Sequence, residues 1–209
     1  MRKLSKSARI FIAILLFGIL YVPTSLLWNA ARPAWCRVLA SMSQPIINII
    51  EITDTSYRIE IEGGDFKLTA RMAVKGKQSR PETYELSGTR KGDLVTYNLN
   101  LWAALFLATV AFIGKPARWK YLLLAPLIIV LFQFFDLAIF AKNTRWILVK
   151  DLSPKFPYAV DYNYSWHWFW YWAQELDRRI LDPFLPLLLW IIFCARSFFT
   201  RGAPAKETA

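Results

Sequence analysis

Cys36 and His167 are the two residues whose types could support covalent chemistry together. An imidazole can activate a thiol as a nucleophile, and Arg37 or Arg178 could stabilise the oxyanion that forms. This combination is the arrangement of a thiol-dependent membrane peptidase or transpeptidase. Cys36 lies in Pro-Ala-Trp-Cys-Arg-Val, which is no nucleophile elbow, and His167 is flanked by tryptophan on both sides. The thiol peptidase therefore remains an alternative hypothesis.

Most of the common sequence motifs of enzymes and cofactor sites are absent from the chain. It has no glycine-rich phosphate loop, no His-Glu-x-x-His, no Cys-x-x-Cys and no Gly-x-Ser-x-Gly. Its single histidine cannot supply the imidazoles of the usual zinc sites. We therefore expect a protein without an enzymatic activity, a metal or a cofactor.

Asp136 is an acidic residue inside an otherwise uncharged apolar segment. Such a residue is usually paired or functional, since an isolated charge is costly in a membrane. We expect it to pair with Lys142 or with an arginine outside the membrane. Alternatively, Asp136 and Gln133, one helical turn earlier, could form a polar contact between helices.

Residues 162–172 have the most unusual composition in the chain, with eight aromatic residues among eleven. Tryptophan and tyrosine favour the membrane interface because their rings are apolar with one polar tip. The segment predicts a helix that anchors the outer ends of neighbouring spans. It could instead bind a lipid-linked sugar, a peptide or a partner helix through four candidate binding residues, Trp166, Trp168, Trp170 and Trp172.

The distribution of charge predicts the elements that position these residues. A helix needs about 20 apolar residues to cross a bilayer, and such stretches recur where charges are few. We expect an α-helical integral membrane protein with four transmembrane helices, at 10–31, 94–114, 121–141 and 180–200. The last span is the weakest because it contains Asp182 and Arg196 near its ends.

Lysine and arginine are placed unevenly around these spans. Residues 1–9, the hairpin 115–120 and the tail 201–209 are basic, with Glu207 as their one acidic residue. The positive-inside rule places these three segments, and hence both termini, in the cytoplasm. Most of the net charge of +11 is thus explained by topology, and we expect no nucleic-acid partner.

The outer segment 32–93 changes from helical to alternating periodicity. Residues 34–50 are consistent with a helix on the membrane surface, and apolar and polar residues then alternate around 57–61, 66–72 and 84–86. Alternation bounded by Gly63-Gly64, Gly76 and Gly88 is typical of antiparallel strands joined by turns. We therefore expect a small antiparallel β-meander outside the membrane, packed on its own helices or offering an edge to a partner. The second outer segment, 142–179, contains the aromatic residues.

Three stretches of the chain resemble the exosortase H-associated membrane proteins. They are Tyr97–Thr109 at the start of the second span, Phe132-Gln133-Phe134-Phe135-Asp136 in the third, and Pro183-Phe184-Leu185-Pro186 in the last. The resemblance covers the whole topology and implies a companion of a membrane transpeptidase-like protease that processes proteins with a carboxy-terminal sorting segment. It implies an accessory role and no catalytic residues.

Together these observations predict a non-enzymatic accessory or assembly subunit of an envelope machine in the bacterial inner membrane. Protein sorting of the exosortase type, or export of a surface polymer, is the expected setting. The lipid bilayer and another integral membrane protein are the expected partners. Two alternatives stay open, namely a thiol peptidase using Cys36 and His167, and a lipid- or glycan-binding module built on the tryptophans.

Overall fold

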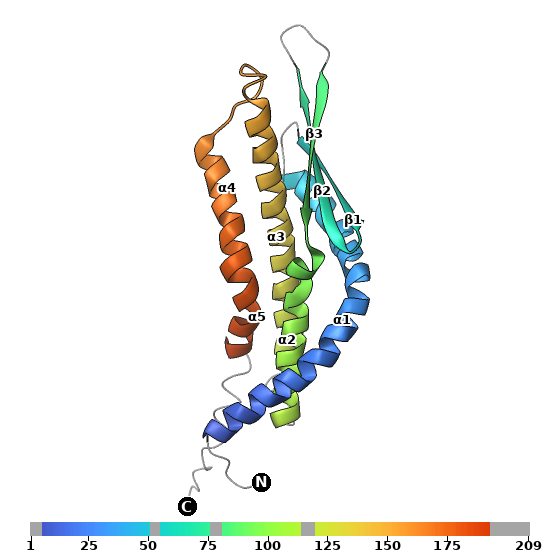
Figure 1. Ribbon diagram of the computed structural model, residues 1–209, viewed down its shortest axis with the longest axis vertical. Helices are drawn as coiled ribbons and strands as arrows, with labels where there is room; N and C mark the ends of the chain where they lie inside the picture. Colours follow the sequence, from blue (N-terminus) through green and yellow to red (C-terminus); the bar gives the residue numbers. More distant parts are fainter. Residues whose placement is uncertain (1–5, 51–54, 76–80, 114–119, 193–209) are drawn as a thin grey trace, which may run out of the picture. The chain divides into compact units, whose positions relative to one another are not determined.

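The computed structural model describes residues 6–50, 55–75, 81–113 and 120–192, and consists mainly of helices with one small sheet (Figure 1). The elements in chain order are α1 (Lys6–Ile50), β1 (Thr55–Glu62), β2 (Asp65–Val74), β3 (Glu82–Arg90), α2 (Gly92–Ile113), α3 (Lys120–Leu152), α4 (Tyr164–Leu176), a π-helix η1 (Asp177–Leu181) and α5 (Asp182–Trp190). The predicted combination of helices with a small antiparallel sheet is confirmed. The chain divides into a first unit (Met1–Ala30, Tyr97–Ile129, Pro183–Ala209) and a second unit (Ala31–Thr96, Val130–Asp182).

The sheet belongs to the second unit and has the strand order β1-β2-β3, with both pairs antiparallel. Gly63 and Gly64 join β1 to β2 with φ angles of +61° and +93°. Two successive residues at positive φ form the tight turn that suits the twist of a hairpin, and glycine adopts this conformation without steric cost. The alternating sequence pattern thus forms a three-stranded meander, as expected.

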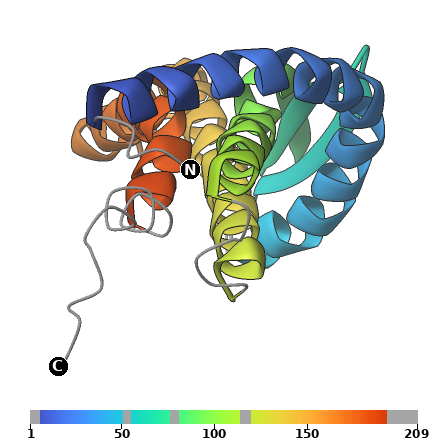
Figure 2. The ribbon, with the colours of Figure 1, turned by 90° about the horizontal axis from the view of Figure 1, so that it is seen from below.

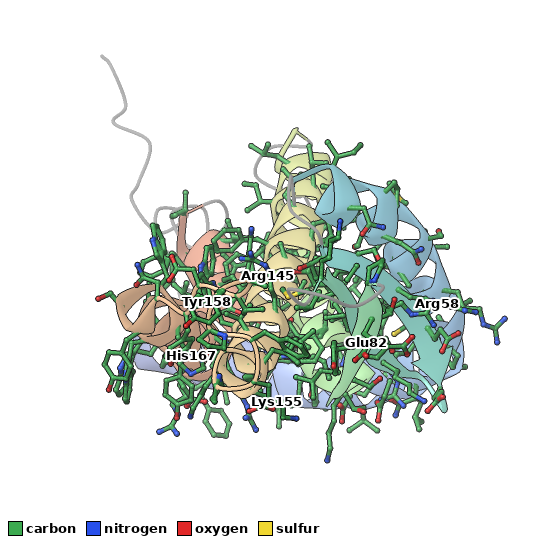
Figure 3. The ribbon with its side chains drawn as sticks, turned by 90° about the horizontal axis from the view of Figure 1, so that it is seen from above. Arg58, Glu82, Arg145, Lys155, Tyr158 and His167 are labelled. Carbon is green, nitrogen blue, oxygen red and sulfur yellow. The ribbon has the colours of Figure 1, made fainter. Side chains whose placement is uncertain are left out.

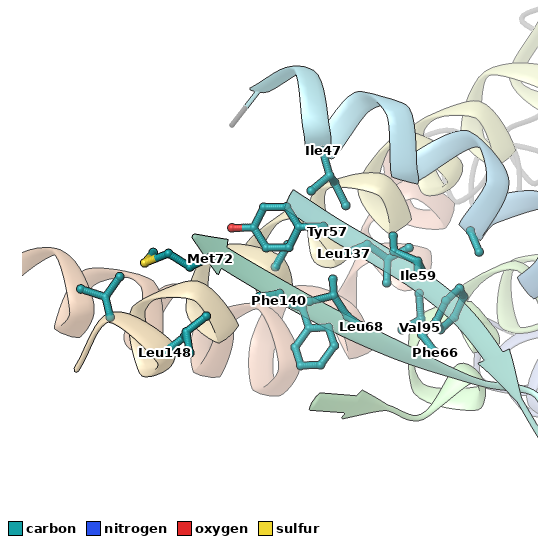
Figure 4. Packing of buried hydrophobic residues seen from close by; sticks show 14 of the residues in the cluster. Ile47, Tyr57, Ile59, Phe66, Leu68, Met72, Val95, Leu137, Phe140 and Leu148 are labelled. Atoms are coloured by element: carbon teal, nitrogen blue, oxygen red, sulfur yellow. The ribbon is translucent and has the colours of Figure 1, made fainter. Parts of the chain in front are cut away.

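One face of the sheet forms the core of the second unit (Figure 4). Phe66 and Leu68 of β2 are at most 1% exposed, and they pack with apolar residues of α1 and α3. Gly88 allows β3 to approach α3, because an added Cβ would lie 3.1 Å from Cζ of Phe140. Burying each large apolar side chain stabilises the unit by roughly 1.5–3 kcal/mol.

The first unit is a set of helices without strands in its described part. Its buried apolar residues are Trp102, Ala125, Ile129 and Leu189. Figure 2 shows the N-terminal half of α1 running across one side of α2 and α5. An apolar groove of about 390 Å³ lies among these helices and is lined in part by Phe17, Leu105 and Phe184.

Two described helical segments are long and apolar enough to cross a membrane, judged by length and composition alone. They are Phe11–Ile49 within α1 and Leu124–Leu152 within α3. The described side chains of α2 include Asp93, Asn98 and Asn100, which lower its mean hydropathy. Residues 193–200 of the predicted last span lie outside the described residues. Most residues of the predicted cytoplasmic segments 1–9, 115–120 and 201–209 also lie outside them.

Two helices extend further than the charge pattern predicted. Residues 34–50 continue α1 and do not form a separate helix, although Arg32 and Pro33 interrupt the apolar run. Similarly, α3 continues past Ala141 to Leu152. The hydrogen bonds of an α-helix are made by the backbone, so a helix can continue through polar residues and need not end where the apolar run ends.

Candidate functional site

A buried cluster of charged side chains lies in the second unit around Arg90, the last residue of β3. Its guanidinium Nη2 lies 2.7 Å from Oδ1 of Asp136 on α3. The same nitrogen lies 3.9 Å from Oδ2 of Asp177 and 3.8 Å from Oδ2 of Asp182. All four side chains are at most 5% exposed. The cluster therefore joins the end of the sheet to α3 and to the η1 region.

The strand and helix geometry explains how these residues meet. Arg90 has the same parity in β3 as Tyr84, Leu86 and Gly88, so its side chain points to the packed face of the sheet. Asp177 and Asp182 are five residues apart, which in an α-helix would separate them by roughly 140° around the axis. The π-turn is wider, and the backbone N–H of Asp182 donates to the carbonyl of Asp177. This turn lets both carboxyl groups face Arg90, and such turns are frequent at functional sites.

Three carboxyl groups around one guanidinium leave an excess of negative charge. The pKa of Asp177 is raised from its ordinary value to about 9, first of all by burial. The charges of Asp136 and Asp182 raise it as well, whereas Arg90 lowers it. Burial raises the pKa because it disfavours the ionised form of a carboxyl group.

The three carboxyl groups lie within 4.8 Å of one another, close enough to share a metal ion. Oxygen ligands of this kind suit hard cations such as Mg²⁺ and Ca²⁺. Here the guanidinium of Arg90 already provides the positive charge beside all three groups. The arrangement can hold a proton and fix the relative positions of β3, α3 and η1, and it contains no thiol or hydroxyl group.

The comparison with known families agrees with this picture of a membrane-associated helical protein. A family model described as "Exosortase H-associated membrane protein" matches residues 5–197. The chain belongs to this family. No curated protein and no solved structure gave a match. The resemblance predicted from three short stretches is therefore confirmed over nearly the whole chain.

Asp136 and Gln133 each have a partner in this member of the exosortase H-associated family. Asp136 pairs with Arg90, which is the predicted partnership with an arginine from the outer segment. Gln133 is 1% exposed, and its Oε1 accepts a hydrogen bond from Nε1 of Trp35 at 3.1 Å. Gln133 thus makes a polar contact between α3 and α1, whereas Asp136 pairs with Arg90 instead of joining Gln133 in that contact.

Cys36 and His167 take no part in the contacts of the Arg90 cluster described above. Cys36 is 0% exposed and packs in the apolar core of the second unit. An added Cβ on Gly92 would lie 3.0 Å from its sulfur atom, so the thiol fills the space beside the start of α2. His167 lies on α4 and packs against Tyr162, with ring centroids 5.7 Å apart. Figure 3 shows His167 on the side of α3 that carries α4, and Glu82 on the side that carries the sheet.

The four candidate tryptophans lie on α4, a helix without fully buried residues. Trp166 and Trp172 are more than half exposed, and Trp168 stacks on Trp172 with centroids 6.0 Å apart. The helix begins where the Asn163 side chain accepts a hydrogen bond from the Trp166 N–H. It lies alongside α3, where Asn143 donates to Gln174 (Figure 1). A role for these rings as an anchor or a ligand platform remains a prediction.

Arg90, Asp177 and Asp182 were not identified from the sequence as site residues. Arg90 carried a signal, since it is a charge on the apolar parity of a predicted strand. Asp182 was noted only as a charge near the start of a span. Nothing in the helical periodicity indicated the π-turn that brings Asp177 and Asp182 to the same side.

Proposed function

We propose that the chain is a non-enzymatic accessory or assembly subunit that acts beside an exosortase in the bacterial inner membrane. The match of the exosortase H-associated family model to residues 5–197 is the observation that carries this proposal. The setting is protein sorting, in which the partner protease processes proteins that bear a carboxy-terminal sorting segment.

The proposed topology has four spans, at 10–31, 94–114, 121–141 and 180–200, with both termini in the cytoplasm. The basic residues of 1–9, 115–120 and 201–209 support this orientation through the positive-inside rule. The sheet and α4 then lie on the periplasmic side. In this arrangement the second unit, apart from its span residues 31, 94–96, 130–141 and 180–182, lies outside the bilayer, where it can meet a partner.

The surroundings of Cys36 favour a structural role for its side chain. A nucleophilic sulfur has to reach the peptide bond of a substrate, whereas Cys36 is 0% exposed within the core. Its immediate neighbours are Gly92 and the residues of the core cluster. These contacts support a subunit whose partner performs the chemistry.

Affinity purification in mild detergent, from cells that express the exosortase at its native level, tests the proposal. We expect the exosortase to co-elute with the wild-type chain in a fixed ratio, and processing of a sorting-segment substrate to fall when the chain is deleted. The Cys36→Ala variant is the matched control, and it should restore processing fully. Purification without the exosortase would contradict the accessory role, and loss of processing with intact Cys36→Ala protein would point to the peptidase.

A further inference from the structure

The apolar groove of the first unit lies between α1, α2 and α5, three helices that pack within this unit (Figure 2). Its volume of about 390 Å³ falls within the roughly 300–1,000 Å³ of small-ligand sites. Two lining residues carry polar side-chain atoms, and Nε1 of Trp190 donates to the hydroxyl of Thr109 at 2.7 Å. The other lining residues are apolar, among them Phe17, Leu105 and Leu187. Because the two polar groups bind each other, the wall favours an apolar ligand.

The size and the surroundings of the groove favour a hydrocarbon chain as its occupant. All lining residues fall within three of the proposed spans, 10–31, 94–114 and 180–200, where lipid chains would surround them. One turn of an α-helix, about 10 Å wide and 5.4 Å long, occupies roughly 420 Å³. The groove therefore holds less than one turn of a partner helix, whereas an acyl chain is a single row of methylene groups that can lie along it. Atoms that line an empty groove lose packing contacts, so a bound chain is favourable.

The groove lies close in sequence to basic residues on the side that we assign to the cytoplasm. Arg9 precedes the lining residue Ala13 by about one turn of α1. Arg196 follows the lining residue Trp190 by six residues in the sequence. Residues 1–9 contain no acidic residue. Lysine and arginine at the cytoplasmic ends of spans attract anionic lipid headgroups, so the charge complements a negative headgroup.

We propose that the groove binds one acyl chain of an anionic phospholipid from the cytoplasmic leaflet, with the headgroup beside the basic ends of the helices. The apolar wall holds the chain, and the positive charge discriminates between headgroups. A bound chain would also contribute to the packing of α1 on α2 and α5. This inference rests on the proposed topology, and it requires no contact with the exosortase.

Native mass spectrometry of the purified chain in mild detergent tests the proposal by titration with phosphatidylglycerol or with phosphatidylcholine of the same acyl chains. We expect one phosphatidylglycerol to bind at least about tenfold more tightly than phosphatidylcholine. Ala13→Trp places a large ring in the groove and should weaken this binding at least about tenfold, because the chain loses its space. Ala30→Trp is the matched control, since it adds the same ring to an exposed position of α1 outside the lining. It should leave lipid binding unchanged.

A second variant tests the headgroup contact without changing the lining of the groove. Arg9→Gln removes one positive charge and should weaken the binding of phosphatidylglycerol about fivefold, with no effect on phosphatidylcholine. This variant tests the proposal even if Ala13→Trp does not fold. Arg58→Gln on the exposed face of the sheet is its matched control and should bind phosphatidylglycerol like the wild type.

The outcomes separate the lipid site from the accessory role. Equal affinity for the two lipids, or unchanged binding by folded Ala13→Trp protein, would overturn the proposal. Loss of the exosortase from Ala13→Trp with unchanged lipid binding would assign the groove to a partner helix and overturn it as well. Failure to recover the exosortase with the wild-type chain, while the lipid results hold, would support the lipid site and overturn only the accessory role.

Discussion

The two units differ in the kind of polar group that each one buries. In the first unit, the contacts between described side chains include neutral ones, such as Nδ2 of Asn100 donating to Ser25 and Nε1 of Trp190 donating to Thr109. In the second unit, one guanidinium and three carboxyl groups are buried together. Neutral contacts between helices contribute about 0.6 kcal/mol on average, whereas an unpaired buried charge costs several. The second unit should therefore be the part that tolerates substitution least.

The largest effect is expected for Arg90→Gln. This substitution removes the guanidinium from Asp136 and Asp182 while it keeps most of the side-chain volume. Breaking a buried ion pair from one side typically costs about 3–5 kcal/mol. Thermal unfolding in detergent should show a correspondingly lower midpoint. Arg71→Gln is the matched control, because its ion pair with Glu85 is exposed and should contribute at most about 1 kcal/mol.

Two single glycines, Gly92 in the second unit and Gly18 in the first, extend the comparison to backbone packing. An added Cβ on Gly92 would lie 2.0 Å from the carbonyl oxygen of Gly64 and 3.0 Å from the sulfur of Cys36. Gly92→Ala must displace the Gly63-Gly64 turn, and overpacking of this kind costs about 3 kcal/mol. In the first unit, Gly18 has nothing within 4 Å of the corresponding position. Gly18→Ala should thus be neutral or stabilising by up to about 1 kcal/mol, and equal losses in both variants would contradict the packing described here.

The raised pKa of Asp177 predicts how stability depends on pH. In the unfolded chain this group ionises near its ordinary value of 3.8, whereas in the folded chain it keeps its proton to about 9. Its contribution is therefore complete below the lower value and is lost as the pH rises to the upper one. Asp177→Asn imitates the protonated acid, so its unfolding midpoint should exceed that of the wild type increasingly between about pH 4 and pH 9. Parallel curves for the two proteins would show that Asp177 is ionised in the fold.

The smallest effect is expected in the first unit for Thr109→Val. The Thr109 hydroxyl accepts from Nε1 of Trp190 at 2.7 Å and donates to the Leu105 carbonyl at 2.8 Å. Its loss should lower stability by about 0.6 kcal/mol and by no more than about 1.7. A loss as large as that of Arg90→Gln would remove the distinction between the two units.

Most of the secondary structure of this chain could be predicted, because local periodicity specifies it. The alternation around Tyr57, Phe66 and Tyr84 predicted the three strands, and the uncharged runs predicted helices where α1, α2 and α3 lie; only 180–192 of the fourth predicted span is described. The ends of α1 and α3 could not be read from charge, since Arg32 and Lys142 lie within continuous helices.

Only part of the candidate site could be predicted from the sequence. Asp136 stood out because it is a lone charge in an apolar run, but its partner is 46 residues away in sequence. Arg90 is a charge on the apolar parity of a strand, but the sequence does not show which residues it meets. Asp177 and Asp182 depend on a π-turn that no simple period predicts. Contacts between residues distant in the chain depend on tertiary packing, which periodicity does not contain.

A double-mutant cycle between Arg90 and Asp136 tests most directly whether the buried cluster acts as one unit. The measurements are the unfolding free energies of the wild type, Arg90→Gln, Asp136→Asn and the double variant. If the cluster holds β3 on α3, the double variant should lose less than the sum of the two single losses, with a coupling of at least about 1 kcal/mol. Additive losses would mean that the two side chains contribute independently, and the cluster would not organise the second unit.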